Sequence, residues 1–366
     1  MRFPLRRTQA ATADPSVEAL PGTQSVPKLI GGAAAFLIVG WLLVKGAGDT
    51  KQFATVTLNG LTLSALFFVV ASGFTLIFGL MRVVNMAHGS LYLLGGYLAF
   101  EMQKAWFTEE SAGLNLSLAS PTGSAAEYDL FGWLVPLLLA CLVIGVLGVV
   151  IQQLFLRWNQ GEDLRQALIT IAISVIMADQ MLAQFGGIAK DVKPPSSWPE
   201  SVSIVGVQYG FFRLVIVTGA ALAIGLLLWW LIKRTRFGLI VRAGVDDREM
   251  VSAIGINIPI VFAAAFFIGA MLAGLGGVLG GTMLSLEPGE DTSFLLNSLI
   301  VVIIGGMGSL GGAAIGALLL GLVDAYADVY LVFGDTDLTN YSILLTFALL
   351  VAVLAVRPLG LFGRPA

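Results

Sequence analysis

The sequence has little charge and almost no cysteine or histidine. Only 12% of its 366 residues are charged, against roughly 25% in soluble domains. A soluble globule of this length needs more polar surface, so a soluble enzyme is excluded. The net charge of −3 leaves no basic field for a polyanion, which excludes nucleic-acid binding. One Cys and one His exclude a disulfide framework and a Cys/His metal cluster, and we expect no cofactor.

Apolar residues and glycine dominate instead. Apolar residues make up 57% of the chain, its mean hydropathy is +0.90, and it contains 44 Gly, as is typical of closely packed membrane helices. We therefore expect an all-α fold, a polytopic transmembrane helical bundle of about 8–10 spans with Gly-interrupted helices. Ten segments approach the ~20 apolar residues that cross a bilayer. They are 29–44, 53–80, 86–106, 131–156, 166–186, 211–232, 260–284, 295–308, 313–333 and 340–356.

The distribution of charge predicts the topology. With ten crossings and a cytoplasmic N-terminus, 14 of the 20 Lys and Arg residues fall on the cytoplasmic side. Acidic residues gather in two outer loops, and one of these contains Glu287, Glu290 and Asp291. Both termini are then cytoplasmic. Residues 1–27 are polar and indicate a disordered cytoplasmic tail, and 28–52 indicate an extra span and connector that is retained rather than cleaved as a signal peptide.

The basic loop at about 233–259 contains a short predicted surface helix. Asp246 or Asp247 suits its N-cap, and Gly255 suits its end. A small apolar face at helical spacing comprises Met250, Val251 and Ile254. We expect this face to dock on a partner, and a plain solvated loop is the alternative.

A second informative segment interrupts the long apolar region between residues 59 and 100. Asn85, His88, Gly89 and Ser90 bring an amide, the only His and a hydroxyl together between two membrane segments. Polar groups at membrane depth are costly and tend to line cavities, and broken helices expose backbone groups at transporter sites. A cytoplasmic turn, with His88 in a structural hydrogen bond, is the alternative.

A glycine-rich segment at 305–312 carries G-x-G-x-x-G at Gly306, Gly308 and Gly311, after a β-branched run. This pattern matches a dinucleotide fingerprint. A Gly-broken membrane helix explains it better, because the next segment is apolar all round and no βαβ pattern surrounds it. In addition, Gly276, Gly277, Gly280 and Gly281 form overlapping GxxxG pairs, which predict a close-packing face.

Four acidic residues lie inside predicted spans, namely Glu101, Asp179, Asp324 and Asp328. A polar arc on one of these helices comprises Thr170, Ser174, Gln180 and Gln184, with Asp179 on the opposite side. Each of these residues is a functional candidate by default, and hydrogen bonding between helices is the alternative.

Several motifs together resemble the LivH-type permease subunit of branched-chain amino acid ABC importers. They are Asn59–Leu63, Gly73–Gly79, Asn85–Gly89, Leu94–Tyr97, Val302–Gly312 and Pro358–Arg364. The loop from Arg242 to Asn257 is similar to that family's coupling loop. The resemblance covers about 53–366, which we expect to be one ABC importer permease domain.

The resemblance implies a bacterial inner-membrane protein that is not itself an enzyme. Its expected partners are the lipid bilayer, a second, LivM-like permease, two cytoplasmic ATP-binding subunits that hydrolyse ATP, and a periplasmic substrate-binding protein. The ATPase-coupling candidates are Arg242, Asp246, Asp247, Glu249 and Gly255. The translocation-path candidates are Asn85, His88, Gly89, Ser90, Thr170, Ser174 and Asp324. N–H groups near Gly89 and Ser90 would meet a substrate carboxylate, and Asp324 its ammonium.

Three alternatives stay open. Urea and short-chain amide importers have similar permeases. An ion-coupled secondary amino acid carrier would explain the intramembrane acids and the broken helices, but not a docking helix. A membrane-embedded enzyme or scaffold is disfavoured, because one His and scattered acids do not form a catalytic set.

Overall fold

The computed structural model describes residues 49–81, 84–107, 130–159, 162–204, 206–246, 248–253, 255–333, 336–337 and 339–363. Most of these residues are helical, which confirms the all-α prediction. The main helices are α2 (Thr50–Met81), α3 (His88–Phe107), α4 (Leu130–Ile151), α5 (Asp163–Phe185), α6 (Thr218–Arg234), α7 (Arg236–Asp246), α8 (Arg248–Ala253), α9 (Ile258–Met283), α10 (Glu290–Gly305), α11 (Leu310–Tyr330) and α12 (Ser342–Val356).

Short elements extend or join these helices. A π-helix η1 (Gln152–Leu156) and a 3₁₀ turn η2 (Arg157–Asn159) continue α4, and a π-helix η3 (Phe212–Val217) leads into α6. A 3₁₀ turn η4 (Thr339–Tyr341) precedes α12. Two antiparallel hairpins pair β1 (Ser201–Ile204) with β2 (Val207–Gly210) and β3 (Val332–Phe333) with β4 (Thr336–Asp337).

Six helices in the described part of the chain are long and apolar enough to cross a membrane. They are Thr50–Gly79, Leu130–Asn159, Asp163–Phe185, Phe212–Arg234, Ile258–Met283 and Leu310–Tyr330. Of the other four predicted spans, 86–106 forms α3, which carries polar residues at both ends. The segments 295–308 and 340–356 form the shorter helices α10 and α12, and 29–44 lies outside the described residues.

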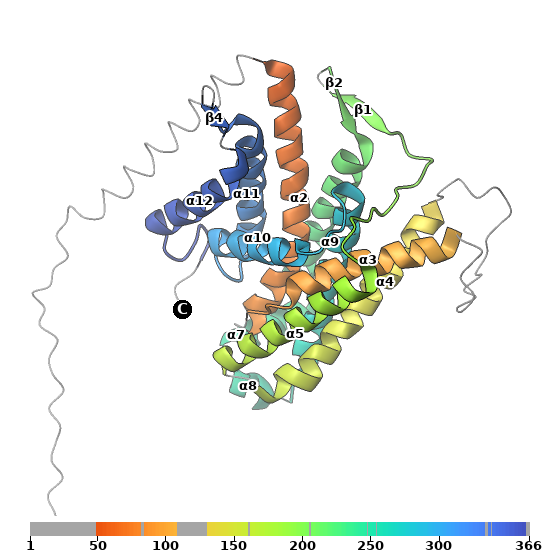
Figure 1. Ribbon diagram of the computed structural model, residues 1–366. Coiled ribbons are helices and arrows are strands. Elements are labelled where there is room, and N and C mark those ends of the chain that lie inside the picture. Colours follow the sequence, from red (N-terminus) through yellow and green to blue (C-terminus); the bar gives the residue numbers. More distant parts are fainter. Residues whose placement is uncertain are drawn as a thin grey trace, which may run out of the picture.

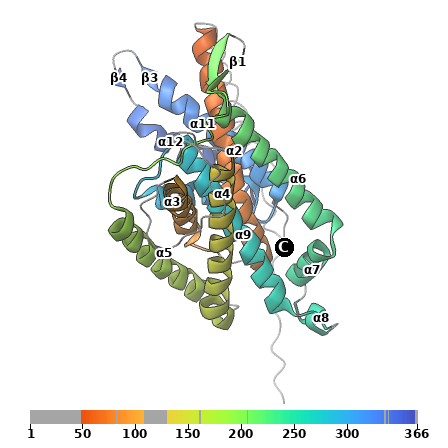
Figure 2. The same cartoon turned by 90° about the vertical axis from the view of Figure 1, so that its right-hand side faces the viewer.

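Helix α2 lies at the centre of the bundle, as Figures 1 and 2 both show. It packs on α9, α10 and α11, and its Leu66, Val69 and Phe74 are almost completely buried. Asp49 caps it, since its carboxylate accepts the backbone N–H groups of Lys51 and Gln52 at 3.0 Å. Helix α5, by contrast, lies at the margin of the bundle, as Figure 2 shows.

Glycine lets α3 and α9 cross almost backbone to backbone. A Cβ on Gly277 would fall 1.9 Å from the carbonyl oxygen of Tyr92, and one on Gly95 would fall 2.5 Å from the Cα of Gly274. The GxxxG residues of α9 therefore form the predicted close-packing face.

Helices α3 and α10 both begin deep inside the bundle. At the start of α3, His88 bonds to the carbonyl of Val70, well within α2. A Cβ on Gly89 would lie 1.9 Å from the carbonyl oxygen of Asp291, in the first turn of α10. Asp291, which was counted with an outer loop, thus belongs to the first turn of α10 and is only 5% exposed, because this helix starts against α3.

The glycine-rich turn between α10 and α11 is tied to residues far along the sequence. Gly306 has φ +97°, and Ser309 caps α11 by accepting the N–H of Gly312 at 3.1 Å. The N–H groups of Leu361 and Phe362 donate to Ile304 and Gly305 at 2.8 and 3.0 Å, which satisfies the last carbonyls of α10. The β-branched run before the turn is helical, so the strand that a dinucleotide fingerprint needs is missing here.

The hairpin β1–β2 is fastened to the N-terminal half of α2. The hydroxyl of Tyr209 donates to the side-chain oxygen of Asn59 at 2.9 Å and lies 2.8 Å from the hydroxyl of Thr62. Burial raises the pKa of Tyr209, so the phenol remains protonated and available as a donor at neutral pH.

Candidate functional site

Three helices meet at a hydrogen-bonded polar junction. The hydroxyl of Ser90, on α3, lies 2.8 Å from the hydroxyl of Ser174 on α5 and donates to the carboxylate of Asp291 on α10 at 3.3 Å. Nearby, Thr170 of α5 accepts the N–H of Met86 at 3.2 Å. Two predicted sets, the broken segment and the polar arc of α5, are thus brought together.

Asn85 shapes the start of α3. Its side-chain oxygen accepts the N–H of Ala87 at 3.1 Å, and its carbonyl accepts the N–H of His88 at 3.2 Å. Such local bonds satisfy the free donors of a helix N-terminus. Asn85 therefore fixes the direction in which Gly89 and Ser90 leave the break.

His88 is enclosed in the bundle by contacts with α2. It is fully buried, its Nε2 lies 3.0 Å from the carbonyl oxygen of Val70, and its ring makes an edge contact with Phe74 at 5.4 Å. These contacts hold the start of α3 against α2. They agree with the alternative interpretation, in which His88 makes a structural hydrogen bond.

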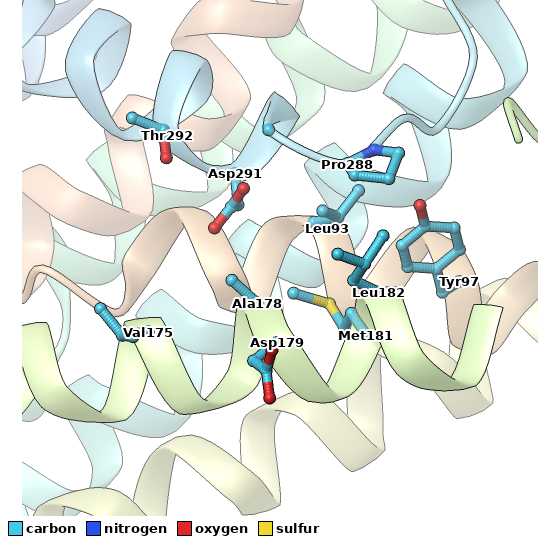
Figure 3. Close-up of a pocket in the computed structure, with 11 residues that line it drawn as sticks. Leu93, Tyr97, Val175, Ala178, Asp179, Met181, Leu182, Pro288, Asp291 and Thr292 are labelled. Carbon is cyan, nitrogen blue, oxygen red and sulfur yellow. The ribbon is translucent and has the colours of Figure 1, made fainter. Parts of the chain in front are cut away.

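A cavity of about 380 Å³ opens beside the junction, between α3, α5 and the start of α10 (Figure 3). It is lined by Leu93, Tyr97, Val175, Ala178, Asp179, Met181, Leu182, Pro288, Gly289, Asp291 and Thr292. The lining is mostly apolar and includes two carboxylates but no Lys or Arg. Small-molecule sites have this size and this mixture of apolar walls with a few polar groups.

Tyr97 closes one end of this cavity. Its ring stacks on Phe185 with centroids 4.4 Å apart, and its residue is only 1% exposed. Its hydroxyl has no hydrogen-bond partner among the described residues. Figure 3 shows this hydroxyl directed toward the loop that carries Pro288, and Asp291 pointing from α10 toward α5.

Sequence reasoning missed Asp291 and Tyr97 as site residues and named Asp179 only as a functional candidate without a specific role. Asp291 was counted with an outer loop because it lies between the predicted spans 260–284 and 295–308, after Pro288 and Gly289. The same Pro-Gly pair directly before a short apolar helix was the available signal for a second broken segment. Asp324, in contrast, lies on α11 and does not line the cavity.

The predicted coupling region contains two helices instead of one. Helix α7 precedes the predicted one, and Thr235 caps it by accepting the N–H of Gly238 at 3.2 Å. Arg242 is exposed on α7, and Gly255 follows α8 with φ +88°, as a helix terminator requires. Asp247 and Ile254, and the side chains of Asp246 and Glu249, lie outside the described residues.

Two residues of the apolar face predicted for α8 differ in burial. Val251 is 3% exposed and joins Val241 and Phe262 around a small pocket, whereas Met250 is 65% exposed. Neighbouring residues of a helix point about 100° apart, so Val251 can face the bundle while Met250 faces outward. Val251 anchors α8 to its own chain and Met250 projects outward.

Comparison with known proteins identifies the family. The family model described as the permease component of branched-chain amino acid transport systems matches residues 56–354. The chain belongs to this permease family. This permease is 30% identical to the high-affinity branched-chain amino acid transport system permease protein LivH of Escherichia coli over 315 residues, and to BraD of Pseudomonas aeruginosa over 323.

The likeness to these relatives extends over most of both chains. Each alignment covers 84% of this permease and 94% of the relative, as does one with LivH of Salmonella typhimurium, also at 30% identity over 318 residues. The resemblance noted in the sequence is thereby confirmed. No solved structure matches the permease.

Proposed function

We propose that this chain is the permease subunit of an ATP-driven importer of branched-chain or related hydrophobic amino acids in the bacterial inner membrane. The observation that carries the proposal is the cavity between α3, α5 and α10, in a chain whose relatives are named as branched-chain amino acid permeases. Its apolar walls suit an aliphatic side chain, and its junction of Ser90, Ser174 and Asp291 suits a charged end.

The predicted translocation-path residues fall into two groups by their contacts. Ser90 and Ser174 lie at the junction beside the cavity, while Asn85, Gly89 and Thr170 hold that junction in place. We propose that these five act together in translocation. His88 and Asp324 then serve the bundle itself, since neither lines the cavity.

A second permease is the proposed partner on α5. This helix exposes Asp179, Gln180 and Gln184 in an otherwise apolar stretch. A charged residue at the centre of a bilayer costs roughly 2.5–3.5 kcal/mol on insertion scales, so this face is better covered by protein than by lipid. The cavity opens on the same helix, and a LivM-like chain there would complete the translocation path.

Two cytoplasmic ATPases would act through α7 and α8. The exposed Met250 and Arg242 supply an apolar and a basic contact, and Gly255 sets the turn into α9. Both termini would be cytoplasmic, and a periplasmic binding protein would deliver substrate to the opposite face, near β1–β2.

Reconstitution tests the transport proposal. The full complex in proteoliposomes should take up labelled leucine only with ATP on the side of the ATPases and binding protein on the other side. Valine and isoleucine should compete, whereas urea should not. Uptake by this chain alone on an ion gradient would refute the ATP-driven assignment. Competition by urea or acetamide, without competition by valine and isoleucine, would show that the permease carries amides instead.

Substitutions in the turn after α8 test coupling. Gly255→Val forces a β-branched residue to φ +88°, so α8 should shift and ATP hydrolysis should continue with uptake reduced about tenfold or more. Gly187→Val is the matched control, since Gly187 is exposed and a Cβ added there would meet no atom within 4 Å. Glu249→Lys should uncouple ATP hydrolysis from uptake in the same way. Normal coupled uptake by both Gly255→Val and Glu249→Lys would exclude docking at α8.

A further inference from the structure

The charged side chains that line the cavity beside α3 are acidic. Its described lining contains Asp179 and Asp291 but no basic side chain. The ion pairs among the described residues, Arg165 with Glu162 and Lys190 with Glu101, involve neither carboxylate. The charged residues of the lining therefore favour a cation over an anion.

Asp291 already occupies the position first expected for a substrate carboxylate. The first turn of α3 presents the positive end of its helix, and Gly89 and Ser90 were expected to bind an anion there. In the structure, Ser90 donates to the Asp291 carboxylate, and Gly89 lies against the backbone of the same residue. A second carboxylate at this place would meet a like charge.

Asp291 retains acceptor capacity beyond its bond to Ser90. A carboxylate has about four acceptor sites, and the hydroxyl of Ser90, at 3.3 Å, is a neutral donor that uses one of them. A buried carboxylate without a counter-charge is costly. Tyr97 adds a second unsatisfied group to the same cavity, a buried hydroxyl without a hydrogen-bond partner among the described residues.

We propose that this cavity is the subsite for the α-ammonium group of the amino acid, which Asp291 binds, with the aliphatic side chain against Leu93, Met181 and Leu182. The Tyr97 hydroxyl donates to the substrate carboxylate, which is bonded to the same α-carbon as the ammonium. The polarity is thus the reverse of that expected from the α3 N-terminus alone. This inference rests on the proposed function, because it takes the substrate to be a hydrophobic amino acid.

Direct binding tests the polarity without the periplasmic binding protein. The permease complex in nanodiscs is titrated with two probes, leucinamide, which keeps the ammonium and lacks the carboxylate, and 4-methylpentanoate, which keeps the carboxylate and lacks the ammonium. Leucinamide should raise the thermal unfolding temperature and 4-methylpentanoate should not. Stabilisation by 4-methylpentanoate alone, or by neither probe, would overturn the assignment.

Asp291→Asn tests the residue itself in the complete transporter. Loss of a charge-assisted contact should raise the KM for leucine about tenfold or more and abolish the leucinamide shift. Glu287→Gln is the matched control, because Glu287 is exposed four positions earlier and does not line the cavity. If Asp291→Asn takes up leucine with an unchanged KM, the ammonium subsite is refuted but the proposed function is not.

Tyr97→Phe keeps the inference testable if Asp291→Asn does not fold. It removes one oxygen that has no partner among the described residues, so the fold should tolerate it. We expect a severalfold higher KM for leucine with the leucinamide shift retained, since the ammonium contact is intact. Equal weakening of both leucine and leucinamide would contradict the assigned orientation. A wild-type complex that does not transport leucine at all would instead refute the proposed function.

Discussion

Helices α2 and α5 are both apolar enough to cross a membrane, yet they differ in surroundings. Within their most apolar stretches, 83% of α2 is buried and only 11% of α5. Helix α2 is enclosed by its own chain, and its buried polar groups, such as Thr62 and Ser64, bond within that chain. Helix α5 turns Thr170 and Ser174 inward and exposes Asp179, Gln180 and Gln184.

This difference teaches that a long apolar run identifies a membrane helix but not its neighbours. Lipid and protein both accept apolar side chains, so hydropathy is similar for either environment. Hydrogen-bonding side chains discriminate, because lipid cannot satisfy them. The exposed polar residues of α5 therefore distinguish it from α2 and support the proposal that another subunit covers it.

The largest expected effect comes from filling the glycine crossing beside α2. Gly277→Val places a side chain where the carbonyl oxygen of Tyr92 lies 1.9 Å from the Cβ position. Overpacking typically costs about 1–3 kcal/mol, and a rigid backbone oxygen puts this site at or above the upper end. Folded yield by size-exclusion chromatography should collapse. Gly219→Val on exposed α6, where nothing lies within 4 Å, should leave the yield unchanged, and equal losses would refute the packing argument.

An intermediate effect is expected on α5, in assembly instead of folding. Asp179→Leu should leave the thermal stability of the isolated chain within about 0.5 kcal/mol, because the residue is exposed. Association with the second permease should weaken by about 1.5–3 kcal/mol, the range for a hydrogen bond to a charged group. Co-purification at graded detergent stringency measures it. The control Asp163→Leu, in the exposed first turn of α5, should associate normally.

The smallest expected effect concerns the bond that ties α5 to the body of the protein. Ser174→Ala removes the 2.8 Å contact with Ser90 and should cost about 0.5–1.5 kcal/mol. Amide hydrogen exchange should accelerate in α5 and stay unchanged in α2. Gln184→Ala changes an exposed polar residue on the same helix and should leave the exchange rates of α5 and α2 unchanged. Faster exchange in both Ser174→Ala and Gln184→Ala would argue against a specific role of the Ser90–Ser174 hydrogen bond.

The parts of the fold that were predictable depend on local patterns. The GxxxG face of α9, the breaks near Gly89 and Gly306 and the helix terminator Gly255 each follow from a few neighbouring residues. The cavity was not predictable, because it requires α10 to begin against α3, about 200 residues away in the sequence. Asp291 looked like a surface acid until that contact was known.

The hydrogen bonds at the end of α10 can form only late in the synthesis of the protein. The carbonyls of Ile304 and Gly305 accept from Leu361 and Phe362, which are 57 residues further along the chain in each case. At ~5–20 residues per second, a ribosome needs roughly 3–11 s to make that stretch. During this interval the end of α10 lacks these two donors, so its last carbonyls form their native hydrogen bonds only after residues 361–362 have been made.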